Sequence, residues 1–113
     1  MKVYTLKSCD SCKKALKWLA EQGIAHEAHD VRADGLMESA VRHIVDTAGW
    51  EEAVNRRSTT WRGLSDADRA DIDDDKAIAL ITANPTLLKR PVFVTEHEVM
   101  VGFNDAIKDW LAA

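Results

Sequence analysis

The strongest constraint on the fold of this chain is a pair of cysteines, Cys9 and Cys12, that separates a strand-like run from an amphipathic helical pattern. Residues 2–6 alternate as a β-strand does, and from Cys12 the apolar residues recur at helical spacing until Gly23. A helix that begins at the first cysteine aims unpaired backbone N–H groups and a positive dipole end at its sulfur. This environment favours the thiolate, which is the reactive form. The order strand, CxxC, helix therefore predicts thiol chemistry.

The rest of the pattern predicts an α/β fold. A weak strand is expected at 24–31, followed by a helix whose apolar stripe starts at Met37 and which ends at Gly49. An irregular polar connection at 51–64 then leads to a short helix after Ser65 and to a helix at 75–83. A hairpin with strands at 91–95 and 98–101 and a helix capped by Asn104 complete the chain. Without its helical middle, the order is βαβ followed by ββα. This is the order of the thioredoxin-like fold, here with a mixed four-stranded sheet and a helical insertion at about residues 35–85. Residues 1–113 are expected to form a single domain.

Composition and charge narrow the function classes. The net charge of −4 argues against direct nucleic-acid binding, which needs a basic face to displace phosphate counterions. No apolar run approaches the roughly 20 residues that span a membrane, and Lys2 and the cysteines come too early for a secretory signal. We therefore expect a cytoplasmic monomer with no membrane partner. In that compartment a lone CxxC is typical of redox chemistry or metal binding rather than of a permanent disulfide.

Two other readings of the cysteine pair remain open from the residues alone. The pair can be buried and inert, or it can be half of a zinc site that His26 and His29 complete as a Cys2His2 set. Against zinc, positions 26 and 29 of a strand face opposite sides of the sheet, and the helix after the cysteines suits a redox fold better than a zinc finger. No metal site is predicted.

Four motifs, in order along the whole chain, give the sequence a family resemblance. They are Lys7-Ser8-Cys9-Asp10-Ser11-Cys12-Lys13-Lys14-Ala15, Thr59-Thr60-Trp61-Arg62, Leu88-Lys89-Arg90-Pro91 and Val101-Gly102-Phe103-Asn104. With them the chain resembles the ArsC (arsenate reductase) family, and within it the YffB-type reductases and the Spx/MgsR-type regulators most closely. The resemblance implies a nucleophilic Cys9, arginines at 57 and 90 that bind an oxyanion or stabilise the thiolate, and a cis proline at Pro91.

The implied roles agree with physical chemistry. Attack on a disulfide, a sulfenic acid or arsenate needs a thiolate, and guanidinium groups stabilise thiolates and bind oxyanions. Cys12 lies one helical turn after Cys9, so it can resolve a mixed disulfide. Catalytic roles are thus predicted for Cys9, Cys12, Arg90 and Arg57, and substrate-binding roles for Lys7, Ser8, Ser11, Thr59, Thr60 and Pro91. Trp61 is expected to anchor its loop to the core.

One departure from the family pattern bears on the activity. Dedicated arsenate reductases of this family carry a third arginine near the last hairpin strand, where this sequence has Val99-Met100-Val101-Gly102-Phe103. The sequence therefore favours a general thiol oxidoreductase that binds no cofactor and draws electrons from glutathione or from a reduced thioredoxin or glutaredoxin. One alternative is an Spx-like regulator that binds RNA polymerase under control of the CxxC disulfide. A true arsenate reductase is the second alternative.

Overall fold

A mixed four-stranded sheet forms the centre of the computed structural model, which describes residues 1–113. The strands are β1 (Lys2–Thr5), β2 (Glu27–Asp30), β3 (Val92–Val94) and β4 (Val99–Val101), in the order β2-β1-β3-β4. β1 and β2 are parallel, whereas β3 is antiparallel to both β1 and β4. The predicted βαβ and ββ connections of the thioredoxin-like fold are therefore confirmed.

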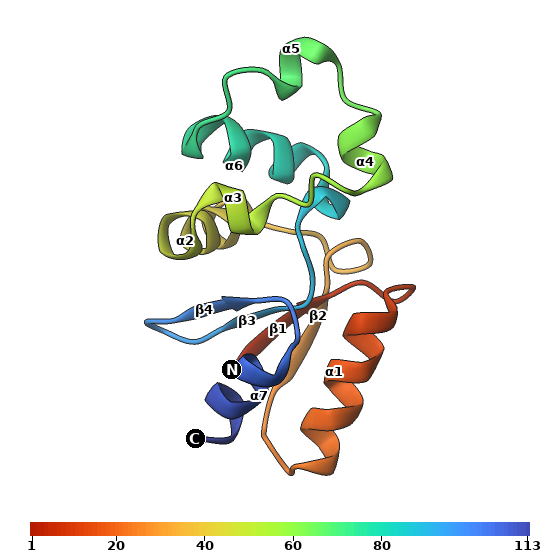
Figure 1. Cartoon of the computed structure of the whole chain (residues 1–113), viewed down its shortest axis with the longest axis vertical. Coiled ribbons are helices and arrows are strands. Elements are labelled where there is room, and N and C mark those ends of the chain that lie inside the picture. The colour runs from red at the N-terminus through yellow and green to blue at the C-terminus, as the bar shows by residue number, and fades with distance from the viewer.

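The two faces of the sheet carry different helices (Figure 1). α1 (Asp10–Glu21) and α7 (Asp105–Ala112) cover one face, and α2 (Glu38–Ala48) covers the other. Successive side chains of a β-strand point to opposite faces of the sheet, so neighbouring residues pack against different helices. The small core under α1 and α7 consists of Val3, Ala15, Leu19, Phe93 and Ile107. Tyr4, next to Val3 in β1, instead joins the larger core on the α2 side.

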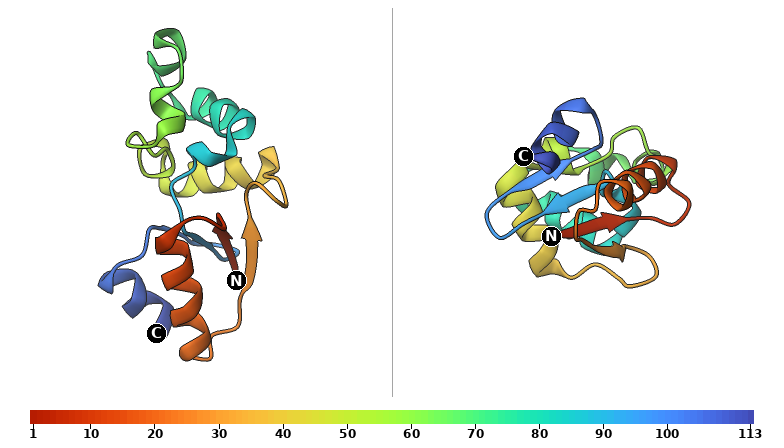
Figure 2. Two further views of the ribbon diagram at one scale, coloured as in Figure 1. Left: turned by 90° about the vertical axis from the view of Figure 1, so that its right-hand side faces the viewer. Right: turned by 90° about the horizontal axis from the view of Figure 1, so that it is seen from below.

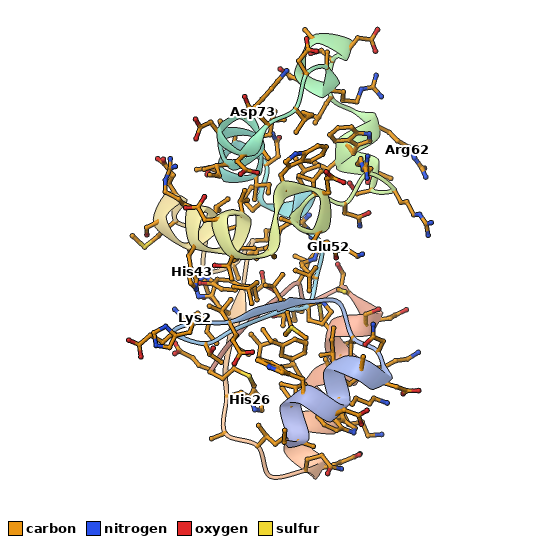
Figure 3. The ribbon with its side chains drawn as sticks, turned by 60° about the vertical axis from the view of Figure 1, so that its left-hand side comes forward. Lys2, His26, His43, Glu52, Arg62 and Asp73 are labelled. Atoms are coloured by element: carbon orange, nitrogen blue, oxygen red, sulfur yellow. The ribbon has the colours of Figure 1, made fainter.

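The helices between β2 and β3 extend the molecule away from the sheet (Figure 2), and its principal extents are 44 × 28 × 25 Å. After α2 they comprise α3 (Trp50–Ala53), α4 (Thr59–Arg62), α5 (Asp66–Arg69), α6 (Asp74–Ala83) and the 3-10 turn η1 (Pro85–Leu87). We call α2–α6 and η1 the inter-strand helices. Ile44 of α2 and Ile81 of α6 are fully buried in their shared core. In Figure 3, Arg62 and Asp73 mark the outer part of this region.

Two local sequence predictions were wrong. The stretch 51–64, expected to be irregular, contains most of α3 and all of α4; in α4 the Ser58 hydroxyl accepts a hydrogen bond of 3.1 Å from the Trp61 backbone N–H. A four-residue helix is too short to show a hydrophobic period, so only the cap signals it. Met37 is not on the buried stripe: it precedes α2 as its N-cap residue and is 75% exposed. The remaining predicted elements are present.

The anchoring role of Trp61 is confirmed, because its half-buried side chain packs against the larger core. No helix is long and apolar enough to cross a lipid bilayer.

Candidate active site

Cys9 lies at the N-terminus of α1, directly after the C-terminal end of β1. It is the N-cap residue, and its extended backbone (φ −87°, ψ 115°) lets its Sγ accept a hydrogen bond of 3.4 Å from the Cys12 backbone N–H. The Cys9 N–H donates to the Leu6 carbonyl at 2.9 Å, which holds the turn between strand and helix. The sulfur therefore lies at the helix N-terminus, where the free backbone N–H groups of the first turn favour negative charge. Its side chain is half-buried, so reagents can reach it.

Cys12 lies behind Cys9 and is only 1% exposed. The pKa of its thiol is raised to about 12, mainly by burial and also by the neighbouring Cys9, while a backbone hydrogen bond at Leu6 and the positive charge of Arg90 act in the opposite direction. Both cysteines are free thiols in this structure. At neutral pH, Cys12 is therefore a protonated thiol whose S–H can stabilise negative charge on Cys9.

Arg90 and Pro91 bring a second segment to the cysteines. The Arg90–Pro91 peptide bond is cis, as the family resemblance implies, and Pro91 is buried at the start of β3. The Pro91 carbonyl accepts a hydrogen bond of 2.8 Å from the Gly102 N–H, which ties the end of β4 to this segment. Tyr4 of β1 pairs with Val92 of β3, so Arg90 and Pro91 lie beside the end of β1 that leads to Cys9, and the positive charge of Arg90 acts to lower the pKa of the Cys12 thiol.

Arg57 lies in the segment that joins α3 to α4. Its side chain is exposed between α3 and α4, and it lines a surface cavity of ≈ 280 Å³ that Arg56, Lys89 and Glu51 also line. The recorded hydrogen bond of Arg57 is made by its backbone N–H to Asn55 Oδ1 at 3.0 Å. The roles predicted for Arg57 and Arg90 stay predictions.

The residues predicted to bind substrate divide into two groups. Lys7 and Ser8 line a cavity of ≈ 410 Å³ on the approach to the CxxC, and Ser11 is exposed in the first turn of α1. Thr59 is exposed on α4, whereas the Thr60 hydroxyl lies 2.8 Å from the Thr86 hydroxyl. Their roles toward a substrate remain predictions.

Two residues beside the CxxC loop were missed by the sequence analysis. Asp30 and Arg32 line the same cavity as Lys7 and Ser8. The Asp30 carboxylate accepts hydrogen bonds of 2.8 Å from the backbone N–H groups of Lys7, Arg32 and Ala33, which lower its pKa. It thereby fastens the loop before Cys9 to the loop after β2. The available signal was an aspartate at the end of a strand and just before a turn, where Asx hydrogen bonds are common.

The histidines are not part of a metal site with the cysteines. His26 Nδ1 lies 2.8 Å from the Ile24 carbonyl and His29 Nε2 lies 2.7 Å from the Gly35 carbonyl. His26 comes just before β2, whereas Cys9 comes after β1, which is parallel to β2, so the two residues lie at opposite ends of these strands. No group of three or more His, Cys, Asp or Glu side chains is arranged to hold a metal ion.

Comparisons with known proteins agree with this architecture. The model of the ArsC family matches residues 4–109. An uncharacterized protein of Haemophilus influenzae is 42% identical over 111 residues, covering 98% of this chain and 96% of the relative. The global transcriptional regulator Spx of Lactiplantibacillus plantarum is 31% identical over 105 residues, covering 91% of this chain and 79% of the regulator.

Solved structures give the same result. A structure of a YFFB protein superposes with a TM-score of 0.93 at 38% identity, covering 99% of this chain and 98% of that one. An arsenate reductase (ArsC) related protein from Brucella melitensis has a TM-score of 0.76 at 36% identity and covers 96% of this chain and 91% of its own.

Proposed function

The chain belongs to the ArsC family, and from this premise we propose that it is a cytoplasmic thiol-disulfide oxidoreductase with Cys9 as nucleophile and Cys12 as resolving thiol. The observation that carries the proposal is the asymmetry of the cysteine pair. Cys9 is accessible at a helix N-terminus, while Cys12 is buried behind it and hydrogen-bonded to it. An accessible thiolate backed by a protected thiol is the arrangement that dithiol exchange needs.

The first step is attack by the Cys9 thiolate on one sulfur of a substrate disulfide. A Cys9–substrate disulfide forms, the substrate S–S bond breaks, and the other half leaves as a thiolate. The backbone N–H of Cys12, whose nitrogen lies 3.4 Å from Cys9 Sγ, stabilises the attacking sulfur before this step. Arg90 contributes positive charge near the pair, which favours anionic sulfur.

The second step is resolution by Cys12. Once Cys9 is in a mixed disulfide it carries no charge and no longer accepts the Cys12 hydrogen bond, so two causes of the high Cys12 pKa are removed. Cys12 then loses its proton, attacks Cys9 Sγ and releases the second substrate thiolate. The resulting Cys9–Cys12 disulfide needs two electrons, which two glutathione molecules or one reduced thioredoxin or glutaredoxin would supply. The chain itself would need no bound cofactor.

The surroundings of Cys9 suit a substrate with anionic ends, such as a glutathione mixed disulfide. Lys7 and Arg32 line the cavity next to the CxxC, and the one carboxylate there, Asp30, is occupied by three backbone N–H groups. Arg57, with Arg56 and Lys89, lines a second cationic cavity. We assign these cations to binding substrate carboxylates.

Arsenate is a poorer candidate substrate. The family's third arginine has no counterpart here: the turn after β4 holds Gly102, whose φ is +93°. One guanidinium contact to a tetrahedral oxyanion would be missing, and a charge-assisted hydrogen bond is typically worth about 1.5–3 kcal/mol. We therefore expect slow arsenate reduction relative to disulfide reduction.

The test is turnover of the mixed disulfide of glutathione and 2-mercaptoethanol, coupled to glutathione reductase and NADPH. Cys9→Ser should abolish turnover, whereas the matched variant Cys12→Ser, mixed with the substrate in the absence of free glutathione, should stop at a Cys9–glutathione adduct detectable by mass spectrometry. Full activity of Cys9→Ser would overturn the proposal, and so would a Cys12→Ser protein that never accumulates the adduct.

A second candidate is a redox-switched regulator, which the similarity to Spx over 91% of this chain favours. In that case reduced and oxidised protein should differ in retention of RNA polymerase on an affinity column. No turnover with any thiol donor, together with such retention by only one redox form, would support this function over the enzymatic one.

A further inference from the structure

The side chain of Arg90 is held by the backbone of η1 rather than by an acidic partner. Its Nη1 donates hydrogen bonds of 2.9 Å to both the Thr86 and the Leu88 carbonyls. Both N–H groups of this nitrogen are thereby used. Arg90 is in none of the ion pairs of the structure. The direction of the guanidinium group thus depends on where these two carbonyls lie.

The other donors of Arg90 are left for an anion. Nε is buried and has no hydrogen-bond partner in the protein. A buried unpaired N–H costs about 1–3 kcal/mol, and each such group in a native structure calls for an explanation. Arg90 comes two residues before Val92, which pairs with Tyr4 near the end of β1 that leads to Cys9, so an anionic sulfur or a substrate oxyanion at the CxxC is the partner that its chemistry fits.

One side of η1 is fixed by the core. Leu87 and Leu88 are fully buried, the Leu87 carbonyl accepts from the Asn55 N–H at 2.9 Å, and the Lys89 N–H donates to the Ala53 carbonyl at 2.8 Å. These contacts fix the position of the Leu88 carbonyl, which is one of the two carbonyls that accept hydrogen bonds from Arg90.

The other side of η1 is held by α4. The Thr86 hydroxyl lies 2.8 Å from the Thr60 hydroxyl, and both side chains are half-buried. This bond joins residues that are 26 positions apart. A continuous path therefore runs from Thr60 through Thr86 to the Nη1 of Arg90.

We propose that Thr60 and Thr86 are positioning residues for Arg90, so that the reactivity of Cys9 depends on the contact between α4 and η1. The inference deepens the proposed function and rests on it, because it assumes that Arg90 favours the Cys9 thiolate. It assigns to Thr60 a role through Arg90 in place of the direct substrate contact predicted from the sequence. It also gives the inter-strand helices a part in the chemistry: they adjust the charge near the sulfur.

The test measures the rate of Cys9 alkylation by iodoacetamide as a function of pH in the full-length protein. Thr60→Val removes the hydroxyl with little change in shape, and Thr60→Ser keeps it. We expect Thr60→Val to shift the alkylation profile to higher pH and to lower the rate at pH 7 by about threefold to tenfold, since one pH unit corresponds to a tenfold change in thiolate fraction. Thr60→Ser should restore most of the rate.

Two further variants separate positioning from stability. Thr82→Val removes a comparable hydroxyl bond of 2.7 Å to the Ile78 carbonyl in α6, which is not part of the path. It should lower thermal stability without moving the alkylation profile. In an Arg90→Ala background, Thr60→Val should have no further effect on the profile.

The outcomes are distinguishable. If Arg90→Ala shifts the profile and Thr60→Val does not, the positioning role is wrong and the proposed function stands. An equal Thr60→Val effect with and without Arg90 also overturns the positioning role. If Arg90→Ala itself leaves the profile unchanged, the role of Arg90 in the proposed function fails, and the positioning role fails with it.

Discussion

The Cys12 backbone N–H donates a hydrogen bond of 3.4 Å to Cys9 Sγ, and the Cys12 residue is 1% exposed, while Cys9 is half-buried at the helix N-terminus. The two thiols, one helical turn apart, thus differ in their access to reagents. The burial that raises the pKa of Cys12 to about 12 also keeps reagents away from it. This difference predicts that Cys9, the accessible sulfur, reacts first.

We predict selective alkylation of Cys9 in the native protein. Iodoacetamide at pH 7.5 should add one group, on Cys9, because Cys12 is buried and protonated at that pH. A second group should add only after unfolding in urea. Peptide mass spectrometry identifies the modified residue. Native Cys9→Ser protein should take up almost no label over the same time, and rapid labelling of Cys12 in that variant would contradict the structure.

We predict that Asp30 stabilises the protein in a pH-dependent manner. Its folded pKa is lowered by backbone N–H groups of the loops at the CxxC. A lowered folded pKa means that the contribution is fully present above the unfolded value of about 3.9 and is lost as the pH falls through the folded value. The melting temperature of Asp30→Ala should therefore lie below that of the native protein at pH 7, and the gap should shrink below about pH 4.

Asp109→Ala is the matched control for this prediction, since Asp109 is an exposed aspartate of α7. Its melting temperature should follow that of the native protein across the pH range. If the difference in melting temperature between the native protein and Asp30→Ala is constant from pH 7 to pH 3, the charge of the Asp30 carboxylate does not contribute to stability.

The sheet and the CxxC could be predicted from sequence because they depend on local patterns. Alternation places Val3 and Phe93 on one face, and the helical period places Ala15 and Leu19 against them. Cys9 as helix N-cap follows from the same reading. These features depend only on a few neighbouring residues, so the local sequence is sufficient to predict them.

The surroundings of the cysteines could not be predicted in the same way. The bonds of Asp30 to the Lys7 backbone and of Thr60 to Thr86 join positions that are 23 and 26 residues apart. No local period encodes such contacts. The family resemblance indicated Arg90 and Arg57 alike; the structure places Arg90 just before β3, beside the end of β1, and Arg57 on a surface cavity between α3 and α4.

We predict that the α1 face of the sheet is sensitive to truncation. Leu19 is fully buried between α1 and the sheet, so Leu19→Ala should lower the free energy of unfolding by about 2–5 kcal/mol. Leu111→Ala, at a half-buried position of α7 in the same cluster, should cost clearly less. Urea unfolding followed by tryptophan fluorescence measures both. Equal losses would show that the two sites bury similar apolar area.

The last prediction concerns Gly102, which holds the turn after β4 beside the cis proline. Its φ of +93° is one that residues with a Cβ rarely adopt, although a Cβ at this position would meet no atom within 4 Å. The cost of Gly102→Ala is therefore backbone strain alone, of about 1–2 kcal/mol. Gly63 is the matched control: its φ is −80° and a Cβ there would lie 3.4 Å from the Thr59 carbonyl oxygen, so Gly63→Ala should be close to neutral.

The same strain would apply to an arginine placed at Gly102 to complete an oxyanion site, because φ and not space limits this position. Gly102→Arg should lose about as much stability as Gly102→Ala, and the strained turn should also weaken the Gly102–Pro91 hydrogen bond. Urea unfolding of the three variants decides the point. A Gly102→Ala protein as stable as Gly63→Ala would show that the turn relaxes readily, and an arginine at 102 would then be compatible with this fold.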